Sequence, residues 1–251
     1  MDKIWFKSYE EKVPRHIDYP KIKLNKFLDD SVSNYPKRTA CNFLGKKVNY
    51  KKLADYVAIF AGSLKSLGVK EGSRVSICLP NCPQFIIGFY AIIKLGAIVT
   101  QTNPLFAERE LEYLLNDSGT ETIITLDLLY PKISQIKAKT KLKHIIVTSI
   151  KDFLPFPLSA LYPIKAKPPK VEYSDQILRF VDLIKKGEKI TESTGTPDST
   201  ALLQYTGGTT GTSKGVILTH SNLVANTIQT ASWLTDAKFG GERILTALPF
   251  F

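Results

Sequence analysis

The sequence predicts an α/β fold, in which a parallel sheet flanked by helices is followed by the start of a second α/β subdomain. Two observations lead to this prediction. From about residue 46, segments with apolar residues three and four apart alternate with short apolar runs, as in successive β-α-β units. Further along, a glycine- and threonine-rich stretch at 206–214 lies between two more strand-like runs.

The first β-α-β elements are delimited by glycine and proline. Apolar residues at helical spacing predict a helix over 50–67, with Gly68 as its stop. A strand over 74–79 is ended by Pro80, and Pro83 suits the first position of a helix that is apolar nearly all round. The same alternation predicts strands at 97–101, 120–126 and 143–148 and helices at 107–116 and 128–138. Right-handed crossovers between parallel strands follow. The turns at 80–82 and 102–105 either border a cleft at the carboxyl ends of the strands or are ordinary connecting turns.

Residues 151–174 interrupt this alternation with five prolines and several lysines. The segment is expected to be a long surface excursion with exposed apolar side chains at Phe153, Phe156, Leu158 and Tyr162. It either packs on its own domain or, with Lys165, Lys167 and Lys170, contacts an anionic membrane. A short helix over 177–186 and a polar linker over 187–199 are predicted next. We therefore divide the chain into a first subdomain, 1–174, and the beginning of a second, 175–251.

Composition and charge restrict the classes of partner. The chain has 251 residues, of which 43% are hydrophobic, so it can bury a substantial core. Its 34 Lys and Arg and 23 Asp and Glu give a formal net charge of +11, which favours anionic partners such as nucleotides, coenzymes, nucleic acid or acidic membranes. The lysines are scattered, which is also typical of a solvated basic surface. No grouping of basic and aromatic residues marks a nucleic-acid-binding module.

Cysteine and histidine usage argues against a metal site or a disulfide framework. The three cysteines, Cys41, Cys78 and Cys82, are too few for a disulfide scaffold, match no zinc spacing, and suit a reducing cytoplasm. His144 and His220 both fall in strands or at strand ends, where a structural histidine is commoner than a catalytic one. The N-terminus lacks the apolar core of a signal peptide, and the longest apolar run, 85–95, is too short to span a bilayer.

The glycine- and threonine-rich stretch is the main candidate for a binding site. It is preceded by a strand over 201–205 and followed by a strand over 215–219 and a helix with Ser221 as its N-cap. Its glycines allow backbone N–H groups to approach a ligand, and its hydroxyls and Lys214 can bind phosphate oxygens. It is not the loop of the P-loop NTPases, because Ser213 stands where that motif requires glycine. The stretch therefore predicts a polyphosphate site of another kind.

The stretch YTGGTTGTSKG at 205–215 resembles the signature YTSGTTGxPKG of the AMP-forming acyl-CoA synthetases, which belong to the adenylate-forming superfamily. Segments at 48–50, 92–119, 219–223 and 248–251 resemble the same family in the same order, so the resemblance runs from about residue 24 to the last residue. Gly207 replaces the common serine, as in fatty acyl-CoA synthetases. Ser213 replaces a frequent proline, which removes no phosphate ligand. The fold would then be the N-terminal subdomain of an adenylate-forming enzyme.

The resemblance implies a two-step reaction with ATP, Mg²⁺ and coenzyme A. A carboxylate attacks the α-phosphorus of ATP to give an acyl-adenylate, and the coenzyme A thiol then takes the acyl group. Thr206 is the implied Mg²⁺ ligand, and Thr206 and Lys214 are the implied catalytic residues. The implied nucleotide-binding set is Thr206, Gly207, Gly208, Thr209, Thr210, Gly211, Thr212, Ser213 and Lys214.

Other elements implied by the resemblance have no match in residues 1–251. These are the adenine and ribose contacts, an acidic Mg²⁺ partner, the acyl pocket, a hinge and a C-terminal domain with a catalytic lysine. We therefore expect a fragment of a longer synthetase, inactive alone and prone to self-association through an exposed apolar face. A fatty acid of medium to long chain is the first choice of substrate. An aryl or short-chain acid, or a non-catalytic nucleotide-binding module, is the alternative.

Overall fold

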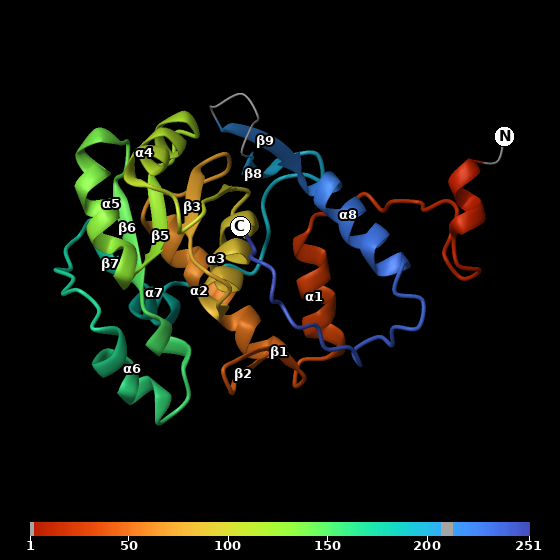
Figure 1. The fold of residues 1–251 in the computed structure, drawn as a ribbon, viewed down its shortest axis with the longest axis horizontal. Coiled ribbons are helices and arrows are strands. Elements are labelled where there is room, and N and C mark those ends of the chain that lie inside the picture. Colours follow the sequence, from red (N-terminus) through yellow and green to blue (C-terminus); the bar gives the residue numbers. More distant parts are fainter. Residues whose placement is uncertain (1–2, 207–212) are drawn as a thin grey trace.

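The computed structural model describes residues 3–206 and 213–251, and its centre is a seven-stranded sheet (Figure 1). The strand order is β7-β6-β5-β3-β4-β8-β9; every neighbouring pair from β7 to β8 is parallel, and β9 pairs antiparallel with β8. The strands are β3 (Arg74–Cys78), β4 (Ile98–Gln101), β5 (Thr122–Leu126), β6 (His144–Thr148), β7 (Ile177–Arg179), β8 (Thr200–Thr206) and β9 (Lys214–Thr219). The prediction of a mainly parallel sheet is confirmed.

Helices cover both faces of the sheet and create two separate cores. One face carries α2 (Tyr50–Ser66), α3 (Pro83–Lys94) and α7 (Phe180–Lys186), and the other carries α4 (Glu108–Asp117) and α5 (Tyr130–Ile136). The rings of Phe60 and Phe180, 4.7 Å apart, join α2 to α7 in the first core. Because β3 to β6 are covered on both sides, their polar residues are buried as well, for example Ser76 and Thr100.

The helix bounds follow from local chemistry. The Asn49 side chain accepts a hydrogen bond from the backbone N–H of Lys52 at the start of α2, and Gly68 adopts a φ of +87° just beyond its end. Pro83 begins α3 as predicted. The predicted helix at 128–138 is three pieces, η2 (Asp127–Leu129), α5 and η3 (Lys137–Lys139).

Several segments differ from the sequence prediction. The excursion at 151–174 contains η4 (Ile150–Phe153) and α6 (Leu158–Ala166), and Phe153 is buried against Tyr56, so it packs the segment onto its own domain. The predicted helix at 177–186 begins as strand β7, which pairs with β6. The domain boundary near residue 174 stays a prediction, and the sheet continues across it. Ser221 does not cap α8 (His220–Ser232), since Thr219 holds the N-cap position.

The predicted linker at 187–199 is packed against the body of the protein. A Cβ atom on Gly62 would lie 1.7 Å from the carbonyl oxygen of Glu188, so this close approach to α2 requires glycine. The backbone N–H of Ile190 donates to the carbonyl of Ala58, and the N–H of Thr194 donates to the carbonyl of Lys94. These contacts route the chain along α2 and α3 to β8.

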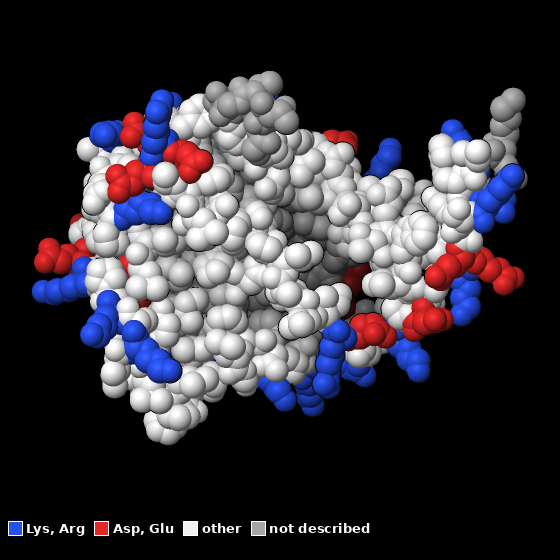
Figure 2. Space-filling view, viewed as in Figure 1, with Lys and Arg blue, Asp and Glu red and all other residues white. Residues whose placement is uncertain are grey.

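Smaller elements lie beside the sheet. They are η1 (Ile4–Ser8), α1 (Asn25–Asn34), and an antiparallel hairpin of β1 (Thr39–Phe43) and β2 (Lys46–Asn49), none of which the sequence predicted. The rings of Tyr9 and Trp233 meet at 4.9 Å and join the N-terminal segment to the end of α8 (Figure 1). Basic side chains are spread over several places on the surface, in agreement with the scattered lysines of the sequence (Figure 2). Among the described residues, no helix is long and apolar enough to cross a membrane.

Candidate functional site

The candidate site lies where β8 ends. Strand β8 is paired with β4 on one side and with β9 on the other, so the loop between β8 and β9 leaves the sheet at the carboxyl edge of its parallel strands. Ligands bind at this edge in open α/β sheets. Six predicted phosphate-binding residues lie outside the described part of the chain: Gly207, Gly208, Thr209, Thr210, Gly211 and Thr212. The structure places the three others, Thr206, Ser213 and Lys214, at the two ends of this loop.

Thr206 and Lys214 are directly opposite each other in the β8–β9 register. Directly opposed residues of an antiparallel pair project to the same face, so the hydroxyl and the ammonium are brought together. Both residues are exposed, and neither side chain has a hydrogen bond or ion pair with a described residue. The Ser213 hydroxyl donates to the carbonyl oxygen of Thr206 at 2.8 Å, which closes the base of the loop. One hydroxyl and one cation are therefore available for an anionic ligand.

Tyr205 anchors this hairpin from the opposite face. Its ring lies over Gly215, where an added Cβ atom would be 3.0 and 3.2 Å from two ring carbons and 3.3 Å from the hydroxyl oxygen. Its hydroxyl donates to a carboxylate oxygen of Asp117 at the end of α4, at 2.6 Å. Burial, together with this carboxylate, raises the pKa of Tyr205, so the phenol stays protonated and remains a donor. The sequence marked Gly215 and the apolar strand but gave no sign of the partnership with Asp117.

The other end of β9 is fixed by a capping box and a buried histidine. The Thr219 hydroxyl accepts from the N–H of Asn222 at 3.2 Å, and the Asn222 side chain accepts from the N–H of Thr219 at 3.0 Å. His220 is fully buried, and its Nδ1 accepts from the N–H of Leu24 at 3.3 Å. Burial and the charge of Lys23 lower the pKa of His220. A neutral, buried imidazole fits the structural role predicted for it.

The turn after β3, one of the two candidate borders of a cleft, holds a later part of the chain. The Asn81 amide nitrogen donates to the carbonyls of Thr246 and Leu248 at 2.9 and 2.7 Å. Its amide oxygen accepts from the N–H of Phe250 at 2.8 Å, and the Phe250 ring lies 5.1 Å from that of Phe85. Asn81 therefore holds residues 246–250 against the carboxyl edge of the sheet, a role that no sequence pattern indicated.

The cysteines are unsuited to metal binding in this fold. All three are free, and burial raises the pKa of both Cys78 and Cys82 to about 12, which keeps them as thiols. Across residues 3–206 and 213–251, no group of three or more His, Cys, Asp or Glu side chains is arranged to hold a metal ion.

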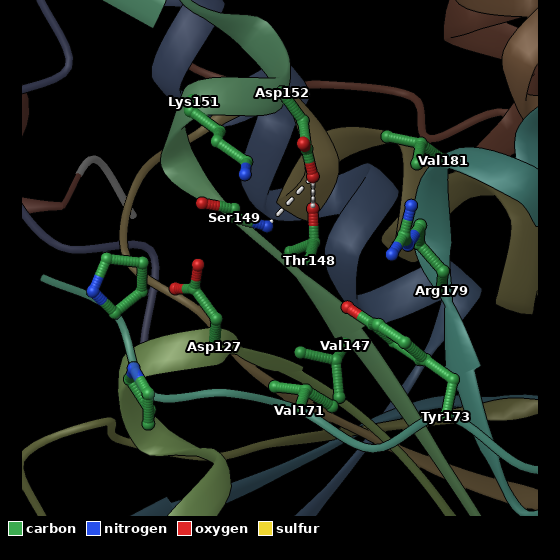
Figure 3. Close-up of a pocket in the computed structure, with 12 residues that line it drawn as sticks. Asp127, Val147, Thr148, Ser149, Lys151, Asp152, Val171, Tyr173, Arg179 and Val181 are labelled. Atoms are coloured by element: carbon green, nitrogen blue, oxygen red, sulfur yellow. Dashed lines mark hydrogen bonds between the residues drawn. The ribbon is translucent and has the colours of Figure 1, made fainter. Parts of the chain in front are cut away.

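A second hollow, of about 260 Å³, lies at the other edge of the sheet (Figure 3). Asp152 forms part of its wall and accepts from the Thr148 hydroxyl at 3.1 Å and from the N–H of Ser149 at 2.9 Å. The Arg179 guanidinium lies 4.6 Å from the centre of the Tyr173 ring. With both acidic and basic side chains in its wall, the hollow indicates no particular ligand, and it lies four strands from β8.

Comparison with known proteins places the chain in one family. A long-chain-fatty-acid–CoA ligase of Bacillus subtilis is 42% identical over 99% of this chain and 46% of its own length, and one of Escherichia coli O157:H7 is 33% identical over 100% and 46%. The chain thus spans about half the length of these curated relatives. The solved long-chain-fatty-acid-CoA ligase of Archaeoglobus fulgidus, 26% identical, superposes with a TM-score of 0.71 over 89% of this chain and 42% of its own. Residues 28–251 match the family of AMP-binding enzymes, and the chain belongs to that family.

Proposed function

We propose that this chain supplies the ATP-phosphate-binding part of a fatty acid–CoA ligase. In the reaction, a carboxylate oxygen attacks the α-phosphorus of ATP and pyrophosphate leaves, which gives an acyl-adenylate. The coenzyme A thiol then loses its proton and attacks the acyl carbon, and AMP leaves. The observation that carries the proposal is the opposed pair of Thr206 and Lys214, which β8 and β9 hold at the carboxyl edge of the sheet at the two ends of the family signature.

The two described side chains suit separate tasks. Lys214 presents an exposed ammonium, paired with no described residue, that can neutralise phosphate charge as the pyrophosphate leaves. The exposed Thr206 hydroxyl can offer one oxygen to Mg²⁺, a cation that usually binds only one or two protein oxygens together with water and phosphate. Magnesium would supply additional charge neutralisation at the phosphates. Ser213 keeps the two ends of the loop together through the Thr206 carbonyl.

A fatty acid is the favoured substrate, because the two curated relatives cited above are named for long-chain fatty acids. An aryl acid is the second candidate. A solved anthranilate CoA ligase, bound to anthranoyl-AMP, shares the fold at a TM-score of 0.68, although it is only 23% identical. A nucleotide-binding module without turnover is the third. Activity with palmitate, benzoate or neither would discriminate among these candidates.

The activity test joins residues 1–251 to the part of the Bacillus subtilis relative that lies outside the matched 46% of its length. We expect this chimera to catalyse ATP–pyrophosphate exchange with palmitate in preference to benzoate, and to lose most of it on Lys214→Ala. The matched control is Lys70→Ala, which removes an exposed lysine from the opposite, amino-terminal end of β3. Exchange that survives Lys214→Ala, or that depends equally on Lys70, would contradict the proposal.

A further inference from the structure

Helix α6 is oriented with its aliphatic side chains toward solvent. Leu158, Leu161 and Ile164 recur every three residues and are exposed, Ile164 to 69%. The side facing the protein is formed by smaller or half-buried residues: Ser159, Tyr162, Pro163 and Ala166. A surface helix normally turns its apolar stripe inward. Because packing does not require the outward-facing aliphatic side chains, this reversed orientation indicates an interaction surface.

Two neighbouring residues extend this surface. Phe156 precedes the helix and is 84% exposed, and Leu44, at the tip of the β1–β2 turn, is 63% exposed. The turn lies against the start of the segment, since a Cβ atom on Gly45 would be 3.6 Å from the Pro155 ring. We call these five exposed residues, Leu44, Phe156, Leu158, Leu161 and Ile164, the apolar patch.

The conformation of Leu44 adds an independent observation. Its φ is +49° and that of Gly45 is +95°, so both central residues of the turn have left-handed backbones. Asparagine, aspartate or glycine is normally found at the first of these positions, and a bulky aliphatic side chain there is strained. Turn stability therefore does not explain this leucine, whereas a role for its exposed side chain does.

The two chain segments that form the apolar patch carry charge of one sign. Residues 153–171 and 39–50 contain no aspartate or glutamate. The basic rim consists of five exposed lysines, Lys46, Lys47, Lys165, Lys167 and Lys170, and none has an ion pair with a described residue. In Figure 2 the surface at the lower left, where Figure 1 places α6, is an uncharged projection with basic side chains beside it. Aliphatic side chains within a cationic rim complement the surface of an anionic bilayer.

We propose that the apolar patch and the basic rim dock this protein on an anionic lipid membrane. The aliphatic side chains would enter the boundary between headgroups and acyl chains, and the lysines would contact lipid phosphates. This inference does not depend on the proposed ligase reaction. Another exposed apolar group, with Phe239 97% and Leu245 91% exposed, has the acidic Glu242 between its members and serves as the comparison.

The test is co-sedimentation of the 251-residue chain with vesicles. Binding should be stronger to phosphatidylglycerol vesicles than to phosphatidylcholine vesicles, and should weaken with salt. The pair Leu161→Ser and Ile164→Ser, and separately the pair Lys165→Glu and Lys167→Glu, should each lower the partition coefficient at least about tenfold. The pair Phe239→Ser and Leu245→Ser should leave it unchanged. Equal binding to both lipids, or equal losses in the control pair, would refute the proposal.

A spectroscopic readout locates the contact. Ile164→Trp places a tryptophan at an exposed position of the apolar patch. Its fluorescence, taken as the difference from the unmodified chain with Trp5 and Trp233, should shift to the blue on binding to phosphatidylglycerol vesicles. Brominated acyl chains in those vesicles should quench it. An added tryptophan that stays unquenched on bound vesicles would show that another surface docks. A dimer in the absence of lipid that Leu161→Ser and Ile164→Ser dissociate would assign the patch to a second copy of the chain instead. Binding to DNA that exceeds binding to vesicles would assign the basic rim to nucleic acid.

Discussion

The two antiparallel hairpins of this protein connect their strands by segments of very different length. In β1–β2, Phe43 pairs with Lys46, so only two residues form the turn. In β8–β9, Thr206 pairs with Lys214, so seven residues, 207–213, join the strands. The short turn has a bulky apolar tip, and the long loop consists of glycine and hydroxyl residues followed by a lysine.

The surroundings of the two hairpins differ as well. Strand β8 lies inside the seven-stranded sheet, and Tyr205 attaches the hairpin to α4, whereas β1–β2 is a separate two-stranded sheet. A rigid base with a polar loop suits a ligand that is bound by many backbone and hydroxyl donors. A tight turn with an exposed aliphatic side chain suits a surface that is contacted by side chains. The difference can be tested because each hairpin begins its second strand with a lysine.

The largest effect should come from exchanging these matched lysines for alanine. Lys214→Ala removes the cation opposite Thr206 and should weaken Mg·ATP binding by about 2 kcal/mol, the range of a charge-assisted hydrogen bond. Lys46→Ala should leave ATP binding unchanged and weaken binding to anionic vesicles severalfold. Nucleotide titration and vesicle sedimentation of both variants measure whether each variant loses only one of the two binding activities. Loss of both activities in one variant would show that the hairpins do not act separately.

The next largest effect concerns the base of the β8–β9 hairpin. Gly215→Ala places a methyl group 3.0 Å from the Tyr205 ring, which the hydroxyl bond to Asp117 holds in place. We expect a loss of about 2 kcal/mol in the free energy of unfolding, measured with urea. In a Tyr205→Leu background the same change should cost much less, because the fixed ring is gone. An undiminished cost there would show that the backbone of Gly215, and not the ring, makes glycine necessary.

Sequence patterns predicted the regular part of this fold well. Four of the buried parallel strands were predicted within two residues of their ends, because apolar runs bounded by glycine and proline leave a clear signal. The three-residue strand β7 was missed, since it is too short to show a period and runs directly into α7. Helix α6 was predicted as an irregular excursion because its prolines obscured it, and Phe153 proved to be a core residue.

The site was predicted only where it is local in sequence. Thr206 and Lys214 could be proposed from the sequence because one loop and its flanking strands identify both, and their role as ligands stays a prediction. The hydrogen bond of Tyr205 to Asp117 joins residues 88 apart, and the bond of Asn81 to Phe250 joins residues 169 apart. Contacts at such separations arise from strand order and helix packing, and a single sequence carries no pattern that pairs their members.

A smaller effect should show whether Leu44 serves docking or only the structure of the β1–β2 turn. Leu44→Asn replaces leucine by a residue that tolerates a positive φ, so the free energy of unfolding should rise by about 0.5 kcal/mol. The same variant should bind anionic vesicles less well, because one member of the apolar patch is lost. Thermal unfolding and vesicle sedimentation give the two measurements. A gain in stability without a loss of binding would remove Leu44 from the docking surface.

The smallest effect should be a pH dependence of the free energy of unfolding that arises from His220, at the end of the β8–β9 hairpin. Burial holds the pKa of His220 below its ordinary value of 6.5, so the folded protein keeps this imidazole neutral. Above pH 6.5 both folded and unfolded states are deprotonated there, and stability does not depend on the group. As the pH falls below 6.5 the unfolded state takes up the proton first, and stability is lost until the folded pKa is passed.

His220→Asn retains an acceptor for the N–H of Leu24 and removes the titration. Urea unfolding at pH 7.5 and pH 5.5 should therefore show a smaller acid loss in this variant than in the unmodified chain. His144→Gln is the matched control, because that histidine also has a pKa lowered by burial but lies more open to solvent, at the start of β6. If His220→Asn and the unmodified chain lose equal stability on acidification, His220 is not the group that makes the β8–β9 side of the protein sensitive to acid.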